Sequence, residues 1–222
     1  AAATIGLDET IALDSAFADF SVHFMTGTDV DYGTDGAGNV KYGWSLTGSN
    51  VASGMYALDA TDTETVIDGI GQGDEIVLNV SGLVITGSEG GIDYFTLTMN
   101  EDTGVVTFAQ ENNIWHDTPG TDGTDPVGPD NHDETATLTL GAGVLEIEQT
   151  VTDADGDTDV ASYDVGAAGA FSIDDDGPSA VTDDEPEAAA TIGLDETIAL
   201  DSAFADFSVH FMTGTDVDYG TD

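Results

Sequence analysis

The stretch DYFTLTMNEDTGVVTFAQ, from Asp93 to Gln110, decides the fold class. Apolar and polar residues alternate through Asp93–Met99 and again through Val105–Gln110, which is the period of β-strands. The residues NEDTG between them have the composition of a tight turn. The sequence therefore predicts a β-hairpin here.

The same two-residue period covers much of the remaining chain, whereas no segment has a convincing helical period. It appears in FADFSVHF (Phe17–Phe24), NVKYGWSLTG (Asn39–Gly48), EIVLNV (Glu75–Val80), ETATLTL (Glu134–Leu140) and GVLEIEQTV (Gly143–Val151). The residues LGAG between the last two segments predict a second hairpin. Many short strands and 28 glycines favour an all-β fold, an elongated Ig-like β-sandwich.

The chain contains an internal repeat. Residues Ala1–Asp35 recur letter for letter from Ala188 to Asp222, 187 residues further on. Such identity indicates recent tandem duplication, and we expect a β-sandwich unit at 1–178, an acidic, proline-containing linker at 179–190 and the first strands of the next identical unit at 191–222. This last segment is too short to bury a core, so we expect a neighbouring molecule to complete it or solvent to surround it.

Charge excludes several classes of partner. Asp and Glu number 45 against a single Lys and no Arg, which gives a net charge of −44. Such a surface cannot neutralise phosphates, so we expect no nucleic-acid partner and repulsion by anionic membranes. Self-repulsion predicts a need for bound cations or high ionic strength, whereas 40% hydrophobic residues argue against disorder.

Neither thiol chemistry nor membrane insertion is expected. The chain has no cysteine, so disulfides and thiolate metal sites are excluded. We find no run of 18 apolar residues and no basic-then-apolar leader in this stretch of sequence, so it predicts no membrane span and no signal peptide.

The sharpest motif is VTDADGDTDV. Asp residues alternate around Gly156, and hard oxygen ligands on a tight turn suit Ca²⁺, which takes six to eight oxygens. It is not an EF-hand, because Ser162 stands where the bidentate Glu would be. The alternative is a solvated acidic turn. The predicted ligands are Asp153, Asp155, Asp157 and Asp159.

Two further acidic groups are candidate Ca²⁺ sites. The first would bridge consecutive units, because its carboxylates repel one another and no Lys or Arg lies near; a flexible charged linker is the alternative. The second precedes a predicted strand and is weaker. The bridging residues are Asp174, Asp175 and Asp176 with Asp195 and Glu196 of the next unit, and Asp8 and Glu9 at the upstream joint. The weaker candidates are Asp29, Asp31, Asp35 and Asn39.

Catalysis has little support. His116–Asp117 and His132–Asp133 lie in one long polar loop (His116–Glu134), but their spacing matches no metal or acid–base signature. We therefore expect these residues at the surface and no enzymatic activity. His23 and its copy His210 are expected to be structural. Five aromatic residues could form a sugar-binding platform, although aromatics in alternating strands are more often core: Tyr42, Trp44, Tyr56, Tyr94 and Trp115.

A resemblance to a known family rests on the order of several motifs. In chain order these are LDET, YGTDGAGNVKYGWSLTG, GDEIVLNVSGLVITG, DYFTLTMNEDTGVVTFAQENNIWH, DETATLTL, TVTDADGDTDVASYDVG and FSIDDDGPSA. Together they resemble the long extender repeat of type I-secreted, RTX-like giant bacterial adhesins and biofilm surface proteins. The resemblance implies extracellular β-sandwich spacers at the bacterial cell surface, stiffened by Ca²⁺, that hold a ligand-binding module away from the cell. The calcium β-roll pattern GGxGxDxUx is absent, and Thr118–Asp133 looks like an insertion.

Four functional hypotheses follow. The leading one is a structural spacer whose partners are adjacent identical units. The alternatives are a filament subunit completed by the strands of a neighbouring molecule, a carbohydrate- or surface-binding module, and halophilic acidity without specific Ca²⁺.

Overall fold

The computed structural model describes residues 3–11, 13–62, 71–116, 134–176, 191–194, 197, 202–208 and 211. The chain divides into two compact units, the first covering Ala1–Asp176 and the second Gly177–Gly220. The first unit is a sandwich-like all-β fold, as the sequence predicts. The predicted linker 179–190 lies outside the described residues.

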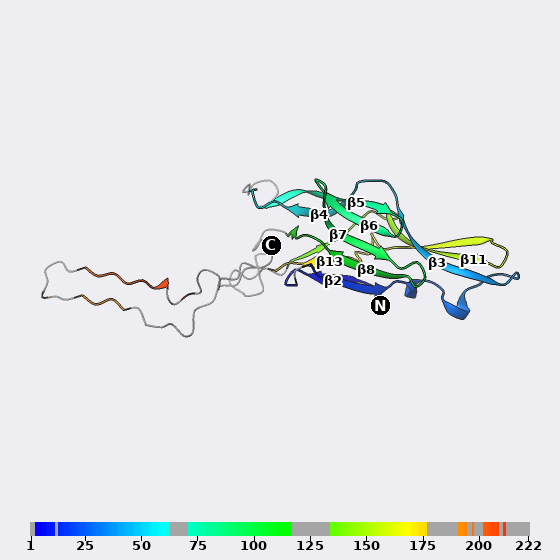
Figure 1. The fold of residues 1–222 in the computed structure, drawn as a ribbon, viewed down its shortest axis with the longest axis horizontal. Coiled ribbons are helices and arrows are strands. Elements are labelled where there is room, and N and C mark those ends of the chain that lie inside the picture. Colours follow the sequence, from blue (N-terminus) through cyan, green and yellow to red (C-terminus); the bar gives the residue numbers. More distant parts are fainter. Residues whose placement is uncertain are drawn as a thin grey trace. The chain divides into compact units, whose positions relative to one another are not determined.

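A seven-stranded antiparallel sheet forms one layer of the first unit (Figure 1). Strands β7 (Ile92–Met99) and β8 (Val105–Gln110) pair with Met99 opposite Val106, which confirms the predicted hairpin of Asp93–Gln110. In spatial order the strands are β2 (Ser15–Asp19), β8 (Val105–Gln110), β7 (Ile92–Met99), β6 (Val84–Glu89), β5 (Gln72–Ser81), β4 (Val51–Leu58) and β9 (Ile114–Trp115).

Two three-stranded sheets accompany this layer. One consists of β1 (Ile5–Asp8), β13 (Phe171–Asp174) and β10 (Thr135–Thr137), and the other of β12 (Thr158–Asp164), β11 (Leu145–Asp153) and β3 (Ala37–Leu46). Among the described strands, β1 and β13 make the one parallel pair, with Ile5 opposite Phe171 and Asp8 opposite Asp174. The first and last strands of the unit therefore run side by side in the same direction.

An aromatic cluster joins the layers. Phe171 of β13 is fully buried and packs edge to face on Phe108 of β8, with ring centroids 5.7 Å apart. Phe20 and Trp44 also contact the Phe171 ring. Burying one such side chain contributes about 1.5–3 kcal/mol to the stability of the fold. This cluster therefore contributes strongly to the packing of β13 against the seven-stranded sheet.

The single strand predicted for Phe17–Phe24 is wrong. Strand β2 ends at Asp19, whose Oδ1 accepts a hydrogen bond from the Ser21 N–H at 2.9 Å, and a 3₁₀ helix follows at Ser21–His23. This side-chain turn competes with the strand ladder. It also points Phe20 into the core, where the side chain is fully buried. A second 3₁₀ helix covers Gly27–Asp29.

The hairpin predicted at LGAG is also wrong. Strand β10 pairs with β13, and β11 pairs with β3 and β12. The chain beyond β10 keeps following the β13 region, because the Leu138 N–H donates to Phe171 O at 3.0 Å and the Leu140 N–H to Gly166 O at 3.3 Å. The turn at Gly141 therefore connects two different sheets.

The second copy of the repeat behaves differently from the first. Ile5 and Leu7 lie in β1 and are 3% and 1% exposed, whereas their copies Ile192 and Leu194 lie outside any strand and are 52% and 64% exposed. Strand β1 depends on pairing with β13, and the printed sequence holds no second copy of Phe171–Asp174.

Within the described residues, no helix is long and apolar enough to cross a membrane.

Candidate functional site

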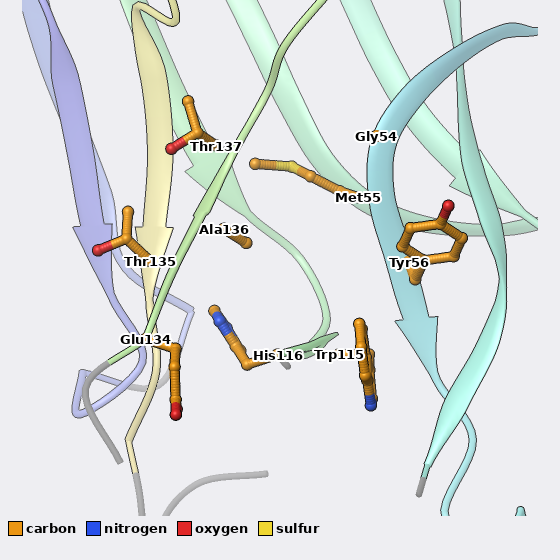
Figure 2. Close-up of a pocket in the computed structure, with 9 residues that line it drawn as sticks. All are labelled: Gly54, Met55, Tyr56, Trp115, His116, Glu134, Thr135, Ala136 and Thr137. Atoms are coloured by element: carbon orange, nitrogen blue, oxygen red, sulfur yellow. The ribbon is translucent and has the colours of Figure 1, made fainter. Parts of the chain in front are cut away.

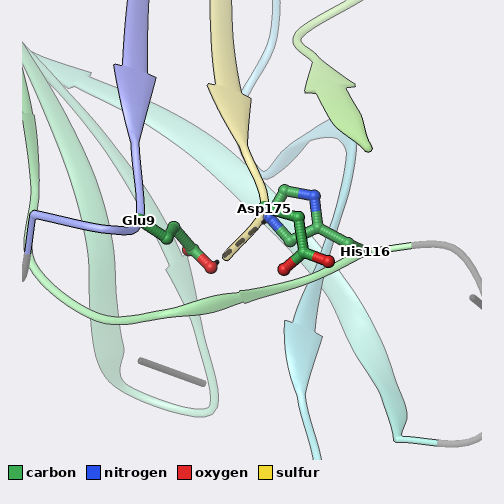
Figure 3. Close-up of side chains that lie close together, drawn as sticks. All are labelled: Glu9, His116 and Asp175. Carbon is green, nitrogen blue, oxygen red and sulfur yellow. Dashed lines mark ion pairs between the residues drawn. The ribbon is translucent and has the colours of Figure 1, made fainter. Parts of the chain in front are cut away.

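Glu9, His116 and Asp175 form a cluster where the entry and exit strands end (Figure 3). Glu9 directly follows β1 and Asp175 directly follows β13, so the parallel register delivers both carboxylates to the same place. The Glu9 N–H extends this ladder by donating to Asp174 O at 3.0 Å. The ligand atoms of the three residues all lie within 4.8 Å of one another.

His116 reaches the cluster from the seven-stranded layer, where it directly follows β9. The two oxygens of Glu9 have different neighbours. Oε1 accepts hydrogen bonds from the Gln110 side-chain amide and from the Ile114 N–H, the latter at 3.2 Å. Oε2 lies 3.5 Å from His116 Nε2. Glu9 therefore links β1 to the opposite layer of the sandwich.

The cluster is shielded from solvent and strongly acidic. The side chains of Glu9 and His116 are 0% and 4% exposed. Burial raises the pKa of Asp175 above its usual value, although the nearby His116 acts in the opposite direction. Burial also raises the pKa of Glu134, as does the charge of the nearby Asp175. The site thus holds carboxyl groups whose ionised forms are poorly solvated.

A pocket of about 410 Å³ adjoins this cluster (Figure 2). His116 and Glu134 belong to its lining, as do Trp115 and Tyr56, whose rings pack edge to face with centroids 6.0 Å apart. The remaining lining residues are Gly54, Met55, Thr135, Ala136 and Thr137. The pocket therefore combines two aromatic rings with an acid and an imidazole.

A second cluster lies at the β11–β12 hairpin. Asp35, Asp153 and Asp155 offer ligand oxygens within 4.8 Å of one another. The hairpin turn needs Gly156, whose φ is +103°, and it closes with the Asp153 N–H donating to Asp157 O at 3.0 Å. The segment carrying Asp35 is held against it because the Ala154 N–H donates to Gly36 O at 3.0 Å.

The electrostatics of the hairpin favour ionised carboxylates. Asp153 Oδ1 accepts hydrogen bonds from the N–H groups of Gly156 and Asp157, at 3.0 and 2.8 Å. Desolvation opposes ionisation of Asp153, but the adjacent Asp155 carboxyl group and these backbone hydrogen bonds lower its pKa overall. A pocket of about 180 Å³ beside it is lined by Asp31, Tyr32, Val151, Asp153, Asp157, Thr158 and Asp159.

The structure thus brings together the sharpest predicted motif and part of the weaker one. Asp31 and Asp35 approach the Asp153–Asp159 hairpin, which sequence spacing did not indicate. Asp29 lies in the 3₁₀ helix Gly27–Asp29 and Asn39 in β3 opposite Thr152. Asp29 is not among the clustered acidic residues of the described part of the chain.

The predicted joint residues are arranged differently from the expectation. Glu9 and Asp175 were assigned to different joints, but the parallel register of β1 and β13 places them in one cluster of the same unit. Asp8 Oδ1 accepts hydrogen bonds from Thr10, and Asp174 Oδ1 accepts one from Thr135 Oγ1 at 2.6 Å. The Asp176 N–H donates to Asp175 Oδ1 at 2.9 Å. Asp195 and Glu196 lie outside the described residues.

Other sequence expectations are settled by burial. The surface position expected for His116 is wrong, since its side chain is buried between the layers; Asp117, His132, Asp133 and His210 lie outside the described residues. The structural role of His23 is confirmed: its Nε2 accepts from the Ala3 N–H and its ring stacks on Tyr163 at 3.7 Å. Tyr42 and Tyr94 are buried, and Trp44 Nε1 donates to Leu83 O at 3.1 Å, so these three are core residues.

Comparison with known families adds one finding. Residues 4–166 match a family described as a domain of unknown function, DUF5801. The chain belongs to the DUF5801 family. Within this DUF5801 domain the match includes Glu9, His116 and the whole hairpin cluster, and it ends before Asp175. No curated protein and no solved structure shows significant similarity to the chain.

Proposed function

We propose that this DUF5801 chain is a non-catalytic spacer, a tandem repeat unit of a secreted, calcium-stiffened bacterial surface adhesin or extracellular fibre. The observation that carries the proposal is the parallel pairing of β1 with β13 in a unit whose first 35 residues recur letter for letter at 188–222. Its partners are adjacent identical units, and it acts outside the cell without nucleic acid or membrane insertion. The resemblance to RTX-like, type I-secreted adhesin repeats points the same way.

Parallel first and last strands suit a spacer for a geometric reason. The chain runs in one direction through β1 and in the same direction when it leaves the unit through β13. A following unit can therefore continue along that direction, whereas antiparallel terminal strands would return the chain toward its entry point. Repetition of such a unit lengthens a protein by one unit at each step.

Charge and donor chemistry support calcium as the stiffening ion. The hairpin cluster offers carboxylate oxygens from Asp35, Asp153 and Asp155, with Asp31 and Asp157 lining the adjoining pocket. Ca²⁺ accepts many oxygen ligands in irregular geometry. The only lysine, Lys41, is held by Asp102 and Glu101 at 2.6 and 3.2 Å, and the chain has no arginine, so neither residue type balances the hairpin.

The proposal is tested by chelation at fixed ionic strength. EDTA is expected to lower the melting temperature of the 222-residue chain, and Ca²⁺ to restore it. If added NaCl restores the same temperature as Ca²⁺, general halophilic acidity explains the composition and specific calcium binding is rejected.

A filament subunit is the first alternative, favoured by the exposed second copy. Ile192 and Leu194 are exposed, while their copies fill the slot beside β13 in the first unit. Donation of 191–222 to another molecule would bury them by strand addition. Light scattering separates the ideas: concentration-dependent oligomers of the 222-residue chain support a subunit, and a monomer supports a covalent array.

A glycan-binding module is the second alternative, favoured by the pocket that contains Trp115 and Tyr56. Aromatic faces beside polar groups are suited to sugar rings. Glycan-array binding that disappears in Trp115→Ala would support this role. Binding that persists in the variant, or that is absent from the wild type, would reject it.

A further inference from the structure

We propose that Glu9, His116 and Asp175 bind a divalent first-row transition-metal ion of the Zn²⁺ class within a single unit. This goes beyond the spacer proposal, which assigns calcium to the hairpin cluster and does not use His116. The two proposals can fail separately, because they concern different residues and different ions.

The spacing of the donor atoms fits one shared ion. Glu9 Oε2 and His116 Nε2 are 3.5 Å apart, which is longer than an ordinary hydrogen bond. Two ligands about 2.0–2.2 Å from a tetrahedral ion are separated by about 3.3–3.5 Å. The Asp175 carboxylate completes a set in which all ligand atoms lie within 4.8 Å of one another, and Figure 3 shows the three side chains converging.

The donor types select the class of metal. An imidazole nitrogen with carboxylate oxygens is a set that Zn²⁺ and its neighbours bind, whereas Ca²⁺ prefers oxygen ligands alone. The hairpin cluster of Asp35, Asp153 and Asp155 contains only oxygen donors. Each unit therefore carries one site suited to a transition metal and one suited to calcium.

Burial and charge make a cation favourable here. The Glu9 side chain is fully buried and that of His116 is 4% exposed. A buried carboxylate is costly unless a positive charge lies near. The chain has no arginine, and its only lysine is held by Glu101 and Asp102. Among the described residues, even a protonated His116 would leave net negative charge beside Glu9 and Asp175.

The surroundings already hold the ligands in place. Hydrogen bonds from Gln110 and Ile114 fix Glu9 Oε1 and leave Oε2 directed at His116. The Asp175 N–H donates to Glu134 O at 2.9 Å, which holds the backbone of this ligand in place. A bound ion would fasten β1 and β13, the strands by which the chain enters and leaves, to β9 of the other layer.

The test uses the full 222-residue chain, freed of metal by chelation and dialysis. Co²⁺ is added first, because its visible absorption reports a nitrogen ligand and coordination geometry, and Zn²⁺ is then titrated in excess Ca²⁺. We expect one equivalent of Co²⁺, displaced by Zn²⁺ and not by Ca²⁺. We also expect Zn²⁺ to raise the melting temperature. Absence of this site, or its displacement by Ca²⁺, would overturn the proposal.

Variants locate the ion. His116→Ala and the nearly isosteric Asp175→Asn should each weaken Zn²⁺ binding by at least about tenfold. His23→Gln, a histidine outside the cluster, and Asp153→Asn, in the hairpin cluster, should leave it unchanged. Circular dichroism verifies that each variant is folded, and Asp175→Asn decides the outcome if His116→Ala does not fold. Unchanged Zn²⁺ affinity in Asp175→Asn would place the ion elsewhere and contradict the assignment.

Discussion

Glu9 Oε2 lies 3.5 Å from His116 Nε2, although Glu9 follows a strand of one sheet and His116 a strand of another. The contact depends on the register of β1 against β13, because that register determines where Glu9 leaves the sheet. Shifting β1 by one residue would turn Ile5 and Leu7 out of the core. The same apolar residues that fold the unit thus also position its buried carboxylate.

Truncation of the central aromatic should be costly. Phe171→Ala removes a fully buried ring that contacts Phe108, Phe20 and Trp44, and we expect the free energy of unfolding to fall by about 3–5 kcal/mol. Phe17→Ala is the matched control, since Phe17 is 76% exposed, and it should change stability by about 0.5 kcal/mol or less. Urea denaturation measures both. Equal losses would contradict the assigned core.

The close approach of the β3 and β11 backbones predicts that a methyl group at Gly38 destabilises the unit. A Cβ at Gly38 would clash with the backbone oxygen of Asp153, whereas a Cβ at Gly43 in the same strand has no atom within 4 Å. Gly38→Ala should therefore destabilise the unit by about 1–3 kcal/mol, and Gly43→Ala should be neutral or slightly stabilising. Thermal unfolding distinguishes them. A harmless Gly38→Ala would show that β3 and β11 are not this close.

The hairpin cluster predicts that Asp35, although distant in sequence from the β11–β12 turn, contributes to Ca²⁺ affinity. Asp35→Asn removes charge from a group shared with Asp153 and Asp155, so it should weaken Ca²⁺ binding roughly tenfold, or about 1.4 kcal/mol. Asp29→Asn is a control that is near in sequence but outside the cluster, and its affinity should be unchanged. Calorimetric titration gives both values. Equal weakening would indicate a general charge effect.

The pH dependence of the buried cluster has a definite sign. The folded state raises the pKa of Asp175 above 3.8, mainly through burial. The protonated Asp175 therefore makes its full contribution to the free energy of unfolding below pH 3.8. This contribution is lost as pH rises through the pKa of Asp175 in the folded state. In EDTA, the melting temperature of Asp175→Asn relative to wild type should therefore increase from about pH 4 to about pH 7. Asp74→Asn, at an exposed position of β5, is the control. A relative decrease would show that Asp175 is stabilised as a carboxylate.

The second copy should be more accessible to protease than the first. Phe204 and Phe207 are 98% and 47% exposed, whereas Phe20, the counterpart of Phe207, is fully buried. Chymotrypsin should cut near Phe204 and Phe207 well before it cuts near Phe20, as mass spectrometry of the fragments can show. In a longer chain that continues with a copy of 36–187, the site at Phe207 should become resistant, because its counterpart Phe20 is buried. Persistent cleavage there would mean that the second copy does not fold as the first does.

Much of the fold could be predicted from the sequence because strand period and turn composition are local signals. The Asp93–Gln110 hairpin is the clearest case. The wrong predictions concern segments whose structure depends on a single hydrogen bond or on pairing with a strand that is distant in the sequence. Asp19 ends β2 through its own side chain. Strand β10 prefers β13 to its sequence neighbour β11, and local turn residues do not encode such non-local pairing.

The candidate sites, too, could be predicted only in part from the sequence. Alternating aspartates around Gly156 identify the β11–β12 turn without any structure. Nothing in the sequence links Asp35 to that turn, since the link is a backbone hydrogen bond from Ala154 to Gly36. Glu9 and Asp175 could be named as candidates from charge, but their meeting with His116 follows from the pairing of the first strand with the last.

The central claim, a calcium-stiffened spacer, is tested most directly by small-angle scattering from chains of two, three and four complete 187-residue units. In Ca²⁺ at fixed ionic strength, the maximum dimension should increase by a constant step with each unit. EDTA should shorten the longer chains, and NaCl should not restore their length. Dimensions that are the same in Ca²⁺ and EDTA, or that do not grow in proportion to the number of units, would contradict the account.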